Sequence, residues 1–168
     1  LIFGGHYMAA LRTGRVPGLL KIFDDAVGQA EKGPNVPRVA EIKISLSRNR
    51  EAAREFVKES AGNRVLNMYR QGYTHEDIQR LGINLDDVAR LDRAEKESVS
   101  AQEFDRLVTD EMIDAIFIAG ASGDCLERLI AVRDTAREQG FQQIMFSELG
   151  PDVDEAVSLL CDDIIPAL

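Results

Sequence analysis

The chain has 168 residues, of which 45% are apolar and 29% charged, and its formal net charge is −9. This size and composition predict one soluble globular domain with a core of its own. The acidic balance without a basic face argues against nucleic-acid binding, and no apolar run approaches the roughly 20 residues that span a bilayer. Since no signal peptide is recognised either, we expect a cytoplasmic protein that binds no membrane.

The two cysteines, Cys125 and Cys161, occupy apolar helical positions and form no CxxC motif. No histidines cluster near them. We therefore expect two buried free thiols in a reducing compartment and no metal site.

The chain opens with Leu1-Ile2-Phe3-Gly4-Gly5 and has no initiator methionine. An apolar run that ends in two glycines is typical of a strand already under way. We therefore expect this chain to be the C-terminal part of a longer polypeptide. Catalytic residues are then expected in the preceding part.

Hydrophobic periodicity and turn residues divide the first half of the chain into five elements. They are a strand at Leu1–Phe3, a loop at Gly4–Pro17, a helix at Gly18–Lys32, a strand at Val39–Ser47 and a helix at Asn49–Tyr69, which Gly62 breaks or bends. The apolar set of the first helix is Leu19, Ile22, Phe23, Ala26, Val27 and Ala30.

The second half begins with a polar helical insertion at about residues 73–97. Its predicted helices are His75–Arg80, capped by Thr74 and stopped by Gly82, and Asn84–Arg93. The later elements are a helix that starts at the capping box Ser100–Glu103, a helix at Thr109–Phe117, a turn at Ala119-Gly120, a helix at Asp124–Gln139 capped by Ser122, a strand at Phe141–Ser147 and a terminal helix at Asp152–Ile165. Strands that alternate with helices predict an α/β fold with parallel pairing and right-handed crossovers.

The strand Val39–Ser47 alternates cleanly between apolar and polar residues. Ile42, Ile44 and Leu46 point one way, and Glu41, Lys43, Ser45 and Ser47 point the other. In an antiparallel sheet the polar face would be wet, whereas in a parallel barrel it would line the lumen. If it faces inward, we expect Glu41 and Lys43 to pair with each other, because buried charges need partners.

The candidate cofactor- or substrate-binding residues lie near predicted strand ends. They are Gly4, Gly5, His6, Ser45, Ser47, Ser147 and Glu148. Two glycines allow a backbone to approach a ligand closely, and His6 is a candidate proton donor. The alternatives are a tight turn at the glycines, a solvated loop histidine, and a carboxylate at Glu148 that caps the following loop. No catalytic residue is assigned.

Three segments resemble the luciferase-like flavin and deazaflavin oxidoreductases, nearest the methylenetetrahydromethanopterin reductase branch. They are Val39-Ala-Glu-Ile-Lys-Ile-Ser-Leu-Ser47 with Glu51-Ala-Ala, Phe117-Ile-Ala-Gly-Ala-Ser-Gly-Asp124, and Phe146-Ser-Glu-Leu-Gly-Pro-Asp152 with Asp162-Asp-Ile-Ile-Pro166. The resemblance covers roughly residues 38–168, in order and spacing. It implies a single-domain fragment over residues 1–168: the C-terminal portion of a TIM (β/α)8 barrel with a helical insertion before the last unit.

This resemblance implies hydride transfer between a deazaflavin coenzyme of the F420 type and a small organic substrate, in a homodimer or higher homo-oligomer. An FMN-dependent monooxygenase of the same superfamily is the alternative. Some relatives hold a sugar phosphate with basic residues. At the comparable places this chain has His6, Asp114 and Asp152–Asp154, and the aspartate carboxylates would repel a phosphate. Two other classes stay open: a non-catalytic interaction protein of this fold, and an unrelated α/β domain that binds a small molecule.

Overall fold

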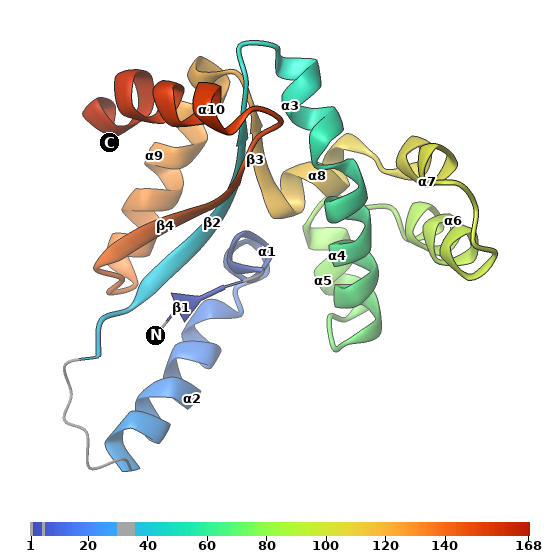
Figure 1. Ribbon diagram of the computed structural model, residues 1–168. Coiled ribbons are helices and arrows are strands. Elements are labelled where there is room, and N and C mark those ends of the chain that lie inside the picture. Colours follow the sequence, from blue (N-terminus) through green and yellow to red (C-terminus); the bar gives the residue numbers. More distant parts are fainter. Residues whose placement is uncertain (1, 5, 30–35) are drawn as a thin grey trace.

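The computed structural model describes residues 2–4, 6–29 and 36–168, and shows a parallel sheet with helices packed around it (Figure 1). The strands are β1 (Ile2–Phe3), β2 (Val39–Leu46), β3 (Phe117–Gly120) and β4 (Gln143–Leu149). The helices are α1 (Tyr7–Arg12), α2 (Val16–Gln29), α3 (Arg50–Phe56), α4 (Lys58–Arg70), α5 (His75–Arg80), α6 (Leu85–Lys96), α7 (Ala101–Leu107), α8 (Asp110–Ile116), α9 (Ser122–Glu138) and α10 (Val153–Leu159), which continues as a π-helical turn at Leu160–Ile164 and a 3-10 turn at Ile165–Ala167.

Strand β2 is the centre of the sheet, and each of its neighbours runs parallel to it. Strand β4 pairs along one edge of β2, from Val39 opposite Gln143 to Ser45 opposite Leu149. Strands β1 and β3 share the other edge, β1 at the start of β2 and β3 at its end. The expected parallel pairing of the first, central and last strands is therefore confirmed, and β3 is an additional strand.

The alternation of β2 separates two environments. Ala40, Ile42, Ile44 and Leu46 enter a hydrophobic core with residues of α1, α2, α9 and α10. Figure 1 shows α9 and α10 on that side of the sheet. A second core contains residues of the helices α4, α5, α6, α7 and α8 and of β3, and these helices form the group on the right of Figure 1. Helix α1 contributes to both cores, through Ala10 to the first and Ala9 to the second.

Several local predictions are confirmed. Thr74 caps α5 and Ser100 caps α7, each in a capping box that an acidic residue three positions on completes. The predicted helix at Asn84–Arg93 is present as α6, Leu85–Lys96, with Asn84 as its cap. Gly82 follows α5 with φ +84°, a left-handed conformation that glycine adopts without strain.

Two predictions near the N-terminus are wrong. The predicted loop at Gly4–Pro17 contains α1, because Tyr7, Met8 and Ala9 are buried between the two cores and helix-forming residues dominate this run. The predicted apolar face of α2 is not its buried face: Leu19 and Ile22 are exposed, while Val16 and Leu20 are buried. The predicted end of this helix, at Lys32, lies outside the described residues.

The remaining corrections concern breaks and boundaries. The long helix after β2 breaks at Val57 rather than at Gly62, which lies within α4 and lets Phe104 and Val108 pack close. The predicted helix at Thr109–Phe117 ends one residue earlier and leads into β3. The cap of α9 is Ala121 instead of Ser122, which is already helical.

The last strand and helix also differ from the prediction. Strand β4 is shifted two residues along, so that Glu148 belongs to it and Phe141 precedes it. Helix α10 buries Ala156 and Leu159 but leaves Val153 and Val157 exposed, and Leu160 is buried in the π-helical turn that follows.

The cysteines do not share one environment. Cys125 is buried, and burial raises the pKa of its thiol to about 12, whereas Cys161 is exposed, contrary to expectation. Within the described residues, no helix is long and apolar enough to cross a bilayer.

Candidate functional site

The polar face of β2 and β4 carries a group of charged and hydroxyl side chains that we call the sheet-face cluster. Its members are Glu41, Lys43, Arg64, Ser147 and Glu148. Nζ of Lys43 lies 3.2 Å from Oε1 of Glu41 and 3.0 Å from Oε1 of Glu148. The Ser147 hydroxyl donates to Oε1 of Glu41 at 2.7 Å. Arg64 reaches Glu148 from α4 at 3.1 Å.

Burial explains why these groups meet. Only 7% of the Lys43 side chain is exposed, and for Glu41 the exposed fraction is 15%. An ammonium group so far removed from water needs carboxylate partners to stay charged. The structure therefore brings together the pair that the alternation of β2 suggests, and it adds a second carboxylate from β4.

The backbone of β4 is irregular where it contributes Glu148. Successive strand residues point to opposite faces, so Ser147 and Glu148 would ordinarily separate. Glu148 instead has φ +77°, a left-handed conformation that is uncommon for any residue other than glycine. With this backbone conformation both side chains contribute to the same cluster.

His6 lies at the edge of the cluster. Its Nδ1 atom is buried and has no hydrogen-bond partner among the described residues. Burial lowers the pKa of His6, and the nearby positive charges of Arg64 and Lys43 lower it further. The imidazole is therefore favoured in its neutral form, which can accept a hydrogen bond or a proton.

Of the two glycines before His6, only Gly4 is among the residues that the structure describes. A Cβ on Gly4 would collide with Oε2 of Glu41, so the absence of a side chain at this position lets Glu41 occupy its place. Gly5 lies outside the described residues.

Two of the candidate serines are used elsewhere. The Ser45 hydroxyl is fully buried and donates to the carbonyl of Ala53 at 2.7 Å, which ties β2 to α3. The Ser47 hydroxyl donates to Glu155 at 2.8 Å and accepts from the amide of Asn49 at 3.1 Å. Ser45 and Ser47 therefore anchor elements that surround the sheet, and the hydrogen bonds of their hydroxyls go to residues outside the sheet-face cluster.

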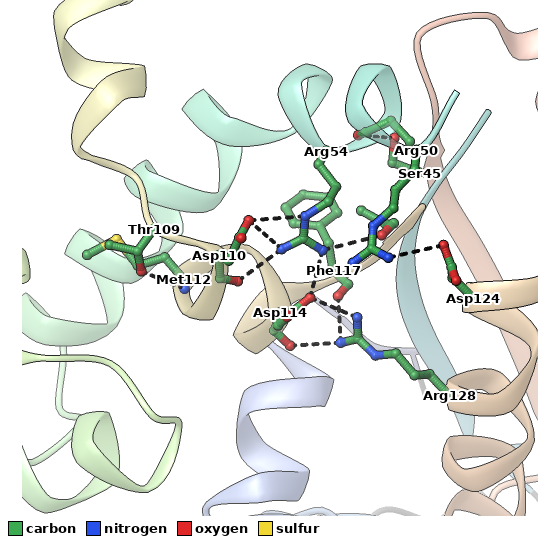
Figure 2. A network of polar contacts seen from close by, with 12 residues as sticks. Ser45, Arg50, Arg54, Thr109, Asp110, Met112, Asp114, Phe117, Asp124 and Arg128 are labelled. Atoms are coloured by element: carbon green, nitrogen blue, oxygen red, sulfur yellow. Dashed lines mark hydrogen bonds and ion pairs between the residues drawn. The ribbon is translucent and has the colours of Figure 1, made fainter. Parts of the chain in front are cut away.

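A second charged group, which we call the arginine clamp, joins α3, α8 and α9 (Figure 2). It consists of Arg54, Asp110, Asp114 and Arg128. Arg54 makes two bonds to Oδ1 of Asp110, at 2.7 and 3.1 Å, and a third to Asp114 at 3.0 Å. Arg128 binds the same Asp114 oxygen at 2.8 Å and also the backbone carbonyls of Asp114 and Phe117.

The clamp changes how the charge of Asp114 is interpreted. Asp114 was expected to repel a phosphate, but two guanidinium groups compensate its charge. Burial works against the charge of Arg54, yet its hydrogen bonds to Asp110 and Asp114 outweigh this effect and raise its pKa above the ordinary value. The clamp is thus a satisfied structural joint at the base of β3.

Sequence reasoning missed Arg64. It lies in a helical segment, and neither periodicity nor spacing connects it to Glu148, which is 84 residues away in the sequence. The residue carries no motif, so only its ion pair with Glu148 in the folded structure reveals its role.

Neither of two surface cavities coincides with the cluster. One of about 320 Å³ lies at the foot of β4, lined by Arg137, Phe141 and Ile144 among others. Another of about 240 Å³ lies between α4, α6 and α7. Among the described residues, no group of three or more His, Cys, Asp and Glu side chains is placed to hold a metal ion.

The fold has a counterpart among solved structures. The coenzyme F420-dependent tetrahydromethanopterin reductase from Methanopyrus kandleri superposes with a TM-score of 0.66 at 20% sequence identity. The match covers 92% of this chain and 41% of that protein's chain, so the present chain spans less than half the length of the reductase. At this identity the likeness establishes the fold. No protein-family profile and no curated protein sequence matches the chain.

Proposed function

We propose that this chain forms part of a TIM-barrel oxidoreductase of the luciferase-like type, which transfers hydride between a deazaflavin coenzyme and a small organic substrate. The observation that carries the proposal is the sheet-face cluster, with its neutral His6, in a chain that superposes on an F420-dependent reductase over 92% of its length. In parallel barrels, ligands bind beside the carboxyl ends of the strands.

The distribution of exposed apolar side chains supports a partial barrel. Among the described residues, six of the seven large exposed apolar side chains lie near one end or the other of the chain. They are Ile2, Leu19 and Ile22 on β1 and α2, and Val153, Val157 and Ile165 on α10 and the turns after it. Strand β4 pairs only with β2 among the described residues. A closed barrel leaves no edge unpaired, so further βα units would cover these margins.

The residues present fit the uncharged part of such a coenzyme. A deazaflavin supplies the hydride-carrying ring, and the protein supplies orientation and hydrogen bonds. His6 offers a buried ring nitrogen that lacks a partner, and Ser147 places a hydroxyl on the same face. Lys43 and Arg64 are already paired with carboxylates, which argues against a phosphate at this face.

The test is optical and uses the complete polypeptide. An absorption spectrum of the purified protein reports any flavin or deazaflavin that copurifies, and fluorescence titrations with coenzyme F420 and with FMN give the two affinities. We expect tighter binding of F420. Tighter binding of FMN would favour the monooxygenase alternative, and binding of neither would leave a non-catalytic protein of this fold.

Substitution of His6 tests the site itself. We expect His6→Ala to lower turnover or raise the KM for substrate with little loss of stability, because a half-buried histidine at a strand end contributes little packing. His75→Ala is the matched control, since His75 is exposed on α5 and stacks on Tyr69. Unchanged kinetics in His6→Ala and in Glu148→Ala would place the substrate elsewhere.

A further inference from the structure

The turn at the carboxyl end of β4 is strained at two consecutive residues. Glu148 has φ +77° and Leu149 has φ +63°, and neither is glycine. The amide of Gly150 donates to the carbonyl of Glu148 at 2.9 Å, which closes a three-residue turn around Leu149. Turns of this kind with a positive central φ are rare and strained.

The turn is fixed at its far side by close packing. Gly150 has φ +146°, and a Cβ at this position would overlap the carbonyl oxygen of Leu46. The turn therefore lies directly against the last residue of β2. This contact limits where the chain can go after Leu149, but it leaves the conformation of Glu148 itself to be held by something else.

The Glu148 side chain supplies that restraint. Its Oε1 atom accepts from Lys43 on β2 and from Arg64 on α4, at 3.0 and 3.1 Å. The Glu148 side chain is 30% exposed and that of Arg64 is 27% exposed, so both pairs are only partly shielded from water. Hydrogen bonds between charged groups are stronger than those between neutral groups, and two of them on one oxygen restrain the side chain and so oppose the strain of a left-handed backbone.

We propose that Arg64 is a positioning residue: together with Lys43 it holds Glu148 in the left-handed conformation and thereby sets the Glu148–Gly150 turn beside the ligand. The inference that this turn meets a ligand rests on the proposed function. The inference that Arg64 holds the turn does not, because it follows from the contacts of Glu148 alone.

The experiment measures the turn directly. In the isotopically labelled protein, a strong NMR contact between the amide proton and the Hα of the same residue marks a positive φ. We expect it at Glu148 and Leu149, and we expect it to weaken in Arg64→Met and to recover partly in Arg64→Lys. Arg70→Met is the matched control: Arg70 lies on the same helix and pairs with Asp92 and Glu95 at the surface. Unchanged contacts in Arg64→Met would overturn the proposal.

Binding separates this proposal from the proposed function. If coenzyme F420 binds, we expect Arg64→Met to weaken its affinity about tenfold, equivalent to about 1.4 kcal/mol, and Arg70→Met to leave it unchanged. A relaxed turn with unchanged affinity would overturn the positioning role. If neither F420 nor FMN binds the unmodified protein, the proposed function fails, while a turn that relaxes in Arg64→Met still supports the role of Arg64 in holding it.

Discussion

The sheet-face cluster and the arginine clamp use the same kinds of side chain but differ in how they are built. In the clamp, Arg54 on α3 bridges Asp110 and Asp114 of α8, a helix that Thr109 caps through its side chain, and none of the four clamp residues has a positive φ. In the sheet-face cluster, Glu148 reaches its partners through a left-handed backbone, and Nδ1 of the adjacent His6 has no hydrogen-bond partner in the part of the chain that the structure describes. Structural joints satisfy every group, whereas functional sites retain strain and unmet hydrogen-bonding capacity.

The largest expected effect is on the clamp. Arg54→Met removes three bonds to the carboxylates of Asp110 and Asp114, and we expect it to lower the free energy of unfolding by about 2–3 kcal/mol. The loss stays below the roughly 3–5 kcal/mol of a fully buried pair because Asp110 is largely exposed. Urea denaturation gives the value. Arg50→Met is the control, since Arg50 is exposed and its 3.6 Å pair with Asp124 is screened. Equal losses in both variants would contradict a special role for the clamp.

A smaller loss is expected from the sheet-face cluster. Considered only with Lys43, Glu41→Ala would leave a buried, uncompensated ammonium and cost roughly 3–5 kcal/mol. The structure gives Lys43 a second partner, Glu148, so we expect about 1–2 kcal/mol in urea denaturation. Glu41→Gln keeps an acceptor for Ser147 and should lose less. A loss of 3 kcal/mol or more in Glu41→Ala would mean that Glu148 does not support Lys43.

The two clusters also differ in how far the sequence predicts them. The alternation of β2 is enough to place Glu41 and Lys43 on one face, because strand periodicity is a local property. The contact of Arg64 with Glu148 and that of Arg54 with Asp114 each join residues tens of positions apart in the sequence. No local pattern encodes such contacts. The same limit explains β3: its four apolar residues follow a helix without a break, and only pairing with β2 distinguishes them from another helical turn.

A pH-dependent effect is expected from His6. The folded-state pKa of His6 lies below the ordinary histidine value of 6.5. As the pH falls below 6.5, the unfolded chain takes up a proton at this position before the folded protein does, so stability decreases until the lowered pKa is passed. We expect urea midpoints to fall more steeply with acid in the unmodified protein than in His6→Asn. Parallel curves for the two proteins would show that His6 is not desolvated.

The smallest effect tests whether strain alone marks a functional site. Ser98 also has a positive φ, +54°, but it lies in an exposed turn after α6 and its side chain carries no charge. Ser98→Gly should therefore raise the free energy of unfolding by about 0.5 kcal/mol, because glycine adopts this conformation without a Cβ penalty. Glu148→Gly relieves the same kind of strain but also removes the contacts to Lys43 and Arg64, so it should lower stability. Thermal or urea unfolding of the two variants checks the contrast. If both substitutions stabilise the protein, the ion pairs of Glu148 do not outweigh its backbone strain, and the distinction between the two clusters would then rest on His6 alone.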